Sequence, residues 1–183
     1  MTTFRSNLDE YKWESFFEEF QSESPRAAVI LSAAFLDSLL RDLLVSFMID
    51  DPTAINEFLG SDKRPEAPIG SFGARIAAAY SLGFLSKVEY DDLRCIKKIR
   101  NKFAHKIHGY SFDNDEIVAL CNKLQTLTED HEVFPLHLDT PQQRYVFTVS
   151  FLLMQISLRI LEAGKEQRIV RGKTTIGQVV KLD

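Results

Sequence analysis

The short run from Arg100 to His105 contains the side chains best suited to chemistry: a guanidinium, the Asn101 amide and an imidazole. A guanidinium does not lose its charge, so a buried arginine needs a carboxylate, backbone carbonyls or a bound anion. On a helical wheel Arg100 falls close to the centre of an apolar stripe, so we expect it to be buried. The expected partner is Asp37, for which Arg41 competes at the i, i+4 spacing. The alternatives are a structural ion pair and an anion site.

Asn101 and His105 lie four residues apart on one flank of the same predicted helix, with His108 nearby. This flank could present an amide and one or two imidazoles to a ligand. It could equally supply hydrogen bonds that fix the following turn at Gly109. Two histidines without a third ligand make a poor metal site, so we expect no metal and no cofactor.

Six fixed cations fall within thirteen positions that contain no acidic residue, although the formal net charge of the chain is −4. They are Arg94, Lys97, Lys98, Arg100, Lys102 and Lys106. Such a run is usually a solvated helix face whose acidic partners lie on neighbouring helices. The functional alternative is a basic patch that contacts an anion or RNA.

Capping signals predict the elements that position these residues. Ser24 precedes Pro25, and the Ser86 and Thr140 hydroxyls are each followed three residues later by Glu or Gln, as in a capping box. No segment alternates at the strand period, so the fold class is all-α. We expect the second, fourth and sixth helices to form the core, with residues 50–70 as a surface excursion. The predicted helices are roughly Leu8 to Gln21, Pro25 to Ile49, Phe72 to Leu82, Lys87 to Ile107, Asn114 to Thr128 and Pro141 to Glu162.

Length and composition favour one helical domain of residues 1–164, followed by a polar tail of residues 165–183. Cys95 and Cys121 occur in apolar helical patterns without metal-ligand spacing, so we expect buried free thiols and a cytoplasmic protein. The longest apolar stretch is interrupted by Gln155 and Arg159, and we expect neither secretion nor a membrane span.

Several classes of function lack their motifs in this sequence. We find no phosphate-binding glycine loop, no nucleophile elbow and no helix-turn-helix. The adjacent carboxylates of Asp91 and Asp92 face about 100° apart on a helix, so we expect them to be solvated. The negative net charge argues against sequence-specific binding of duplex DNA by this domain alone. A symmetric homodimer is the commonest closed assembly and is expected here.

Three stretches, Arg26 to Leu40, Ile69 to Gly83 and Ile96 to Asp113, resemble the mannitol operon repressor family of bacterial regulators. The match runs from about Pro25 to about Leu124. Members of that family are all-helical transcription regulators without an evident DNA-reading motif. The resemblance therefore implies control of gene expression through a protein partner or a dimer.

More distantly, Arg100, Asn101 and His105 match the arginine, polar residue, three residues, histidine signature of HEPN domains. This resemblance implies an HEPN-like bundle and, as an alternative function, a metal-independent ribonuclease or an RNA- or nucleotide-binding protein. Arg100 would hold the scissile phosphate, His105 would act as general acid or base, and Asn101 would orient them. Because Arg100 and His105 lie about 140° apart on an ideal helix, either the helix would have to distort near Gly109 or a second subunit would have to complete the site.

Overall fold

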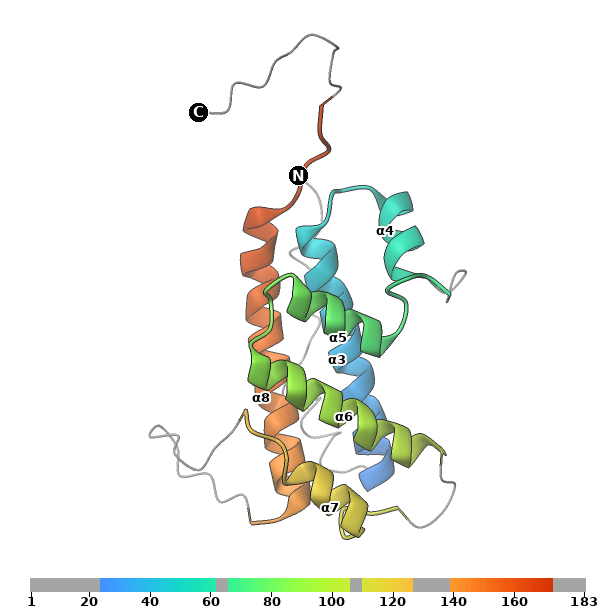
Figure 1. Ribbon diagram of the computed structural model, residues 1–183, viewed down its shortest axis with the longest axis vertical. Coiled ribbons are helices and arrows are strands. Elements are labelled where there is room, and N and C mark those ends of the chain that lie inside the picture. The colour runs from blue at the N-terminus through green and yellow to red at the C-terminus, as the bar shows by residue number, and fades with distance from the viewer. Residues whose placement is uncertain (1–23, 62–65, 106–109, 127–138, 173–183) are drawn as a thin grey trace.

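The computed structural model describes residues 24–61, 66–105, 110–126 and 139–172 (Figure 1). Within these ranges every regular element is helical, so the all-α prediction is confirmed. The predicted helix from Leu8 to Gln21 lies outside the described residues. The helices are α3 (Pro25–Phe47), α4 (Pro52–Leu59), α5 (Phe72–Ser81), α6 (Lys87–His105), α7 (Asp115–Cys121) and α8 (Pro141–Ala163), and a 3-10 turn, η1 (Gly164–Glu166), follows α8.

The predicted caps begin three of these helices. At α3, the Ser24 hydroxyl accepts a hydrogen bond from the backbone N–H of Ala27 at 3.2 Å. At α8, Thr140 and Gln143 form a complete capping box, in which each side chain accepts from the other residue's backbone N–H. At α6, Ser86 and Glu89 make the same reciprocal pair. The sequence signals therefore locate the beginnings of α3, α6 and α8 correctly.

Helix α4 is longer than expected, because residues 50–70 were predicted to form a surface excursion with at most a short helical turn. The carboxylate of Asp51 accepts from the backbone N–H groups of Thr53 and Ala54, and Pro52 occupies the first helical position. A capping side chain followed by proline is also the signal that begins α3, so the sequence did contain the information. The prediction gave more weight to the prolines and glycines later in residues 50–70, which are typical of loops.

Helix α7 ends at Cys121, several residues before the predicted end at Thr128. The cause is Asp92 of α6, whose carboxylate accepts from the backbone N–H groups of Gln125, at 3.0 Å, and Thr126, at 2.7 Å. Asp92 is 1% exposed, so the prediction of a solvated carboxylate was wrong for this residue. Burial raises the pKa of Asp92, although its bonds to Thr126 and Gln125 act in the opposite direction.

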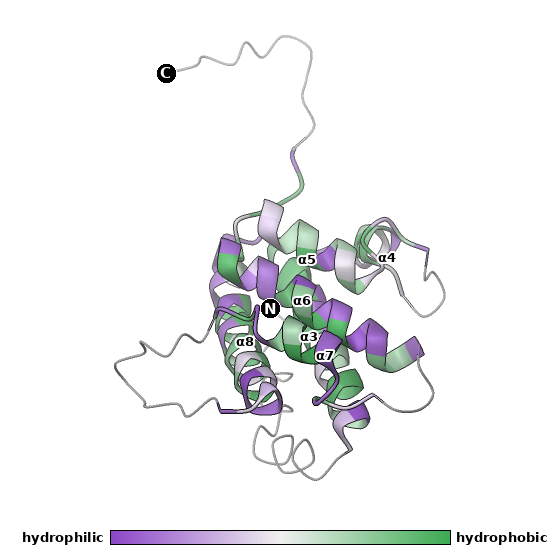
Figure 2. Cartoon of the chain, turned by 60° about the horizontal axis from the view of Figure 1, so that its bottom comes forward, coloured by the Kyte–Doolittle hydropathy of each residue, from purple (hydrophilic) through white to green (hydrophobic). Residues whose placement is uncertain are grey.

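Helix α3 is the centre of the bundle, as predicted. It packs against α8 on one side and against α5 and α6 on the other, while α7 contacts both α6 and α8 (Figure 1). Figure 2 shows hydrophobic residues where these helices meet. The fully buried core includes Leu36, Leu39, Leu40 and Leu43 of α3, Ile96, Ile99 and Phe103 of α6, and Val149, Leu152 and Ile156 of α8.

Helix α8 with η1 is long and apolar enough, by composition alone, to cross a membrane. Its inner face is instead part of the bundle core, where the hydroxyl of Tyr145 lies 2.8 Å from that of Ser32 in α3. Packing against α3 accounts for the apolar residues of the inner face, whereas Phe147, Met154, Leu158 and Leu161 of α8 are exposed. Arg159, which interrupts the apolar stretch, forms an ion pair with the buried Glu89 of α6 at 2.7 Å and so connects α8 to α6.

Candidate functional site on helix α6

Arg100 is exposed, and its guanidinium donates a hydrogen bond to the Oδ1 atom of Asn101 at 3.0 Å. The predicted burial of Arg100 and its ion pair with Asp37 are therefore wrong. Asp92 and Cys95 are also buried, and they widen the inner face of α6 on the side away from Arg100. This places Arg100 at the edge of that face, where its long side chain reaches solvent.

The partner of Asp37 is Arg75 of α5, at 2.7 Å. The same guanidinium donates to the backbone carbonyl of Ile69 at 3.2 Å and to that of Leu59 at 3.1 Å. Arg75 therefore connects α3, the end of α4 and the segment that leads into α5. The sequence prediction missed it, although an aspartate in the apolar helix α3 signalled that some buried arginine was needed.

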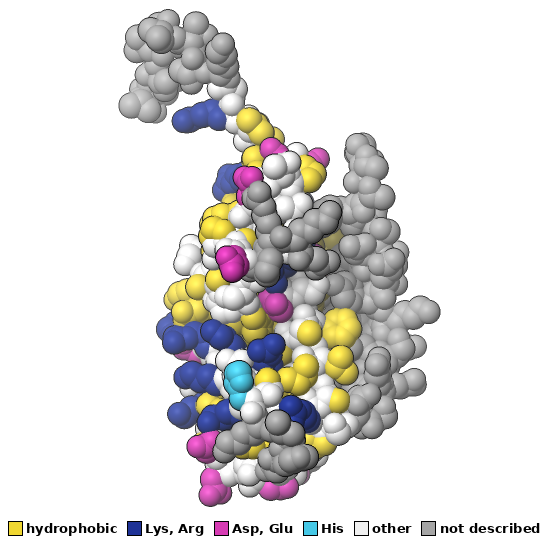
Figure 3. Space-filling view, turned by 90° about the vertical axis from the view of Figure 1, so that its right-hand side faces the viewer, with side chains coloured by type: hydrophobic (Ala, Val, Ile, Leu, Met, Phe, Trp, Pro, Cys, Tyr) yellow, Lys and Arg dark blue, Asp and Glu magenta, His cyan; other side chains and the backbone are white. Residues whose placement is uncertain are grey.

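The predicted basic patch is largely at the surface of α6. Arg94 and Lys98 are exposed, Lys97 and Lys102 are partly exposed, and Lys106 lies outside the described residues. Figure 3 shows lysine and arginine side chains gathered around a histidine on this side of the molecule. Of these cations, Lys102 forms an ion pair with Glu116 of α7 at 2.6 Å. We use the term basic face for Arg94, Lys97 and Lys98, which share the outward side of α6.

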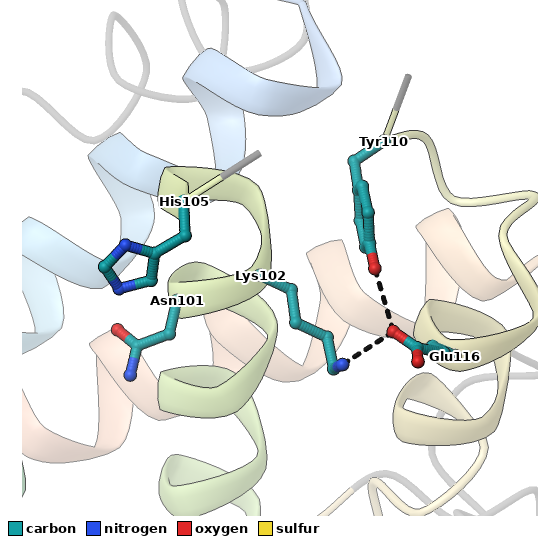
Figure 4. Close-up of a pocket in the computed structure, with 5 residues that line it drawn as sticks. All are labelled: Asn101, Lys102, His105, Tyr110 and Glu116. Carbon is teal, nitrogen blue, oxygen red and sulfur yellow. Dashed lines mark hydrogen bonds and ion pairs between the residues drawn. The ribbon is translucent and has the colours of Figure 1, made fainter. Parts of the chain in front are cut away.

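A hollow of about 330 Å³ lies at the C-terminal end of α6 and is lined by Asn101, Lys102, His105, Tyr110 and Glu116 (Figure 4). Asn101 and His105 lie side by side, whereas Lys102 points toward α7. There the Lys102 ammonium and the Tyr110 hydroxyl both donate to Oε2 of Glu116, at 2.6 and 2.8 Å. The hydrogen bond with Glu116 raises the pKa of Lys102.

The amide of Asn101 and the imidazole of His105 can form hydrogen bonds with a ligand in this hollow, but few of its lining side chains are suited to acid-base or nucleophilic catalysis. Arg100 does not line it, so the structure does not bring Arg100 and His105 together within one chain. Among the described residues there is no cluster of three side chains that could hold a metal ion.

The two cysteines are free and buried, as predicted. Burial raises the pKa of the Cys121 thiol to about 12 and also raises that of Cys95. Both thiols are therefore protonated at neutral pH, which makes them poor nucleophiles.

Comparison with known proteins gives one consistent family. A family profile described as "Mannitol repressor" matches residues 14–176. The mannitol operon repressor of Escherichia coli strain K12 is 21% identical over 148 residues, which cover 73% of this chain and 76% of that protein. The corresponding repressor of the O6:H1 strain CFT073 matches with the same identity and coverage.

Among solved structures, the chain matches the X-ray structure of the MtlR-HPr complex from Escherichia coli. The TM-score is 0.59 at 19% sequence identity, and the match covers 79% of this chain and 97% of that chain. At this level of identity the match establishes a shared fold. The HEPN-like description and the symmetric homodimer stay predictions.

Proposed function

The chain belongs to the mannitol repressor family, and from this premise we propose that it is a cytoplasmic regulatory protein that controls gene expression through a protein partner of the HPr kind. The observation that carries the proposal is the fold match to a chain solved in complex with HPr, which extends over 97% of that chain. A regulator that works in this way needs a stable docking surface and does not need a DNA-reading motif of its own.

The helix pair α5 and α6 supports a partner protein over direct reading of DNA. A five-residue connection containing Gly83, whose φ is +80°, joins the two helices. In a helix-turn-helix, residues at the N-terminal end of the second helix contact the bases. Here that end of α6 carries the exposed carboxylate of Asp91 and the buried Glu89. Asp91 is paired with Lys87 and Glu89 with Arg159, so residues 87–91 offer no unpaired cation to the phosphates on either side of a major groove.

The experiment that tests the proposal is a calorimetric titration of the chain with HPr from the same organism. We expect saturable one-to-one binding with a Kd of roughly micromolar order, which is typical of transient regulatory contacts. An unrelated protein of similar size and net charge is the control and should give no saturable heat. Absence of binding by HPr well above micromolar concentration would remove the partner from the proposal.

Metal-independent cleavage of RNA is a second candidate, and one observation favours it. Arg100 is exposed beside Asn101 and is not locked into a buried ion pair, so its charge is available to a phosphate. A second subunit would have to bring its arginine to His105. The result that this candidate requires is cleavage of labelled RNA in the presence of a chelator, abolished by His105→Ala at an equal folded fraction.

A further inference from the structure

The outward side of α6 carries a continuous row of side chains. Tyr90, Arg94, Lys97, Asn101 and His105 recur at intervals of three or four residues, so they share one side of the helix. This side is opposite the buried Ile99 and Phe103, and each member of the row is exposed or partly exposed. From Tyr90 to His105 the helix rises about 22 Å, at about 1.5 Å per residue.

Among the described residues, no neighbouring helix neutralises the positive charge of the basic face. In the described parts of the chain, no carboxylate lies within ion-pair distance of Arg94, Lys97 or Lys98. Surface cations usually pair with a nearby carboxylate, as Lys87 of α6 does with Asp91 at 2.6 Å. Three unneutralised cations on a chain of net charge −4 repel one another, and a polyanion would relieve that repulsion.

The side chain of Lys97 packs against Gly73 of α5. Its alkyl chain lies across Gly73, where an added Cβ would come within 2.3 Å of the Lys97 Nζ atom and 3.1 Å of Cε. A larger residue at position 73 would push the ammonium group away. Because Gly73 has no side chain, the side chain of Lys97 can pack directly against α5.

An aromatic pair lies next to the basic face. The rings of Tyr80, from α5, and Tyr90 are stacked, with centroids 4.3 Å apart and an interplanar angle of 19°. The Arg94 guanidinium lies 5.4 Å from the centroid of Tyr90. Tyr80 is 37% exposed. Proteins that bind single strands combine such exposed rings, on which bases stack, with cations that follow the backbone.

We infer that the basic face of α6 and the adjacent Tyr80 form a binding surface for single-stranded nucleic acid. A row of about 22 Å is long enough for about four nucleotides, the lower end of known site sizes. Stacking on Tyr80 requires unpaired bases, which excludes an intact duplex from that contact. Such a surface would let a regulator without a helix-turn-helix reach a transcript.

The test is fluorescence anisotropy with a labelled RNA of mixed sequence, about 12 nucleotides long. We expect a Kd of about 10 μM at low salt, and a slope of log K against log salt of about −2 for three cations. Lys97→Gln/Lys98→Gln should weaken binding about tenfold or more and reduce the slope by about 1.4. Lys165→Gln/Arg171→Gln, which removes two exposed cations elsewhere, should change Kd less than about twofold.

Tyr80→Ala separates stacking from charge. It should weaken binding of the RNA about fivefold or more while leaving any binding of duplex DNA unchanged. Circular dichroism of each variant ensures that equal folded fractions are compared. The proposal is overturned by absence of RNA binding at low salt, by equal losses in the two double variants, or by duplex DNA binding as tightly as the single strand.

Discussion

Arg75→Met should lower the free energy of unfolding by about 3 kcal/mol. The substitution leaves the Asp37 carboxylate, which is 29% exposed, without its partner, and it removes the hydrogen bonds to the carbonyls of Ile69 and Leu59. These groups anchor α4 and the following segment to α3. Denaturant unfolding measures the loss, and hydrogen exchange should show faster exchange in α4 than in α8.

Arg100→Met is the matched control, because it removes the same guanidinium from an exposed position. Its hydrogen bond with Asn101 is made at the surface, so the free energy of unfolding should change by no more than about 0.5 kcal/mol. A larger loss of unfolding free energy in Arg100→Met than in Arg75→Met would contradict the ion pair between Asp37 and Arg75.

Arg159→Met is the second large expected effect, again about 3 kcal/mol at pH 7. It leaves the carboxylate of Glu89, whose side chain is 7% exposed, without the cation that neutralises it. Helices α6 and α8, which both pack against α3, lose the ion pair that connects them directly, and an uncompensated charge stays buried. The exposed pair between Lys87 and Asp91 provides the control, since Lys87→Met should cost no more than about 0.5 kcal/mol.

The effect of Arg159→Met should depend on pH in one direction. Burial by itself raises the pKa of Glu89, but the hydrogen bond from Arg159 and those from Ser86 outweigh it and hold the pKa below the usual 4.5. A lowered carboxyl pKa contributes stability that is present above the unfolded pKa and is lost as pH falls through the folded pKa. The two proteins should therefore differ fully at pH 7 and progressively less below about pH 4.5. A difference that does not shrink in acid would contradict this.

The sequence predicts a helix correctly where a capping residue precedes apolar residues that recur at the helical spacing. Ser24 with Pro25 and Thr140 with Gln143 located the beginnings of α3 and α8, because both signals are local. The end of α7 was not readable, because a buried carboxylate from another helix, Asp92, takes the backbone N–H groups of Gln125 and Thr126. A contact between distant segments leaves no local signal in either one.

The candidate site was predicted less well than the fold, for a geometric reason. The run of cations on α6 was visible in the sequence, and its outward position follows from the helical period. The sequence does not show which residues form ion pairs. Either Arg75 or Arg100 could pair with Asp37 until the packing of α5 against α3 is known. The stacking of Tyr80 on Tyr90 likewise depends on how α5 packs against α6.

Regulation of gene expression is tested most directly by sequencing transcripts from cells with and without the gene for this chain. We expect deletion to change a small set of transcripts several-fold, and the wild-type chain to restore them. Arg75→Met, produced at a temperature where it is largely unfolded, should fail to restore them, while Arg100→Met should succeed. An unchanged transcript profile in the deleted strain, under conditions where the chain is abundant in the parent, would contradict a regulatory function.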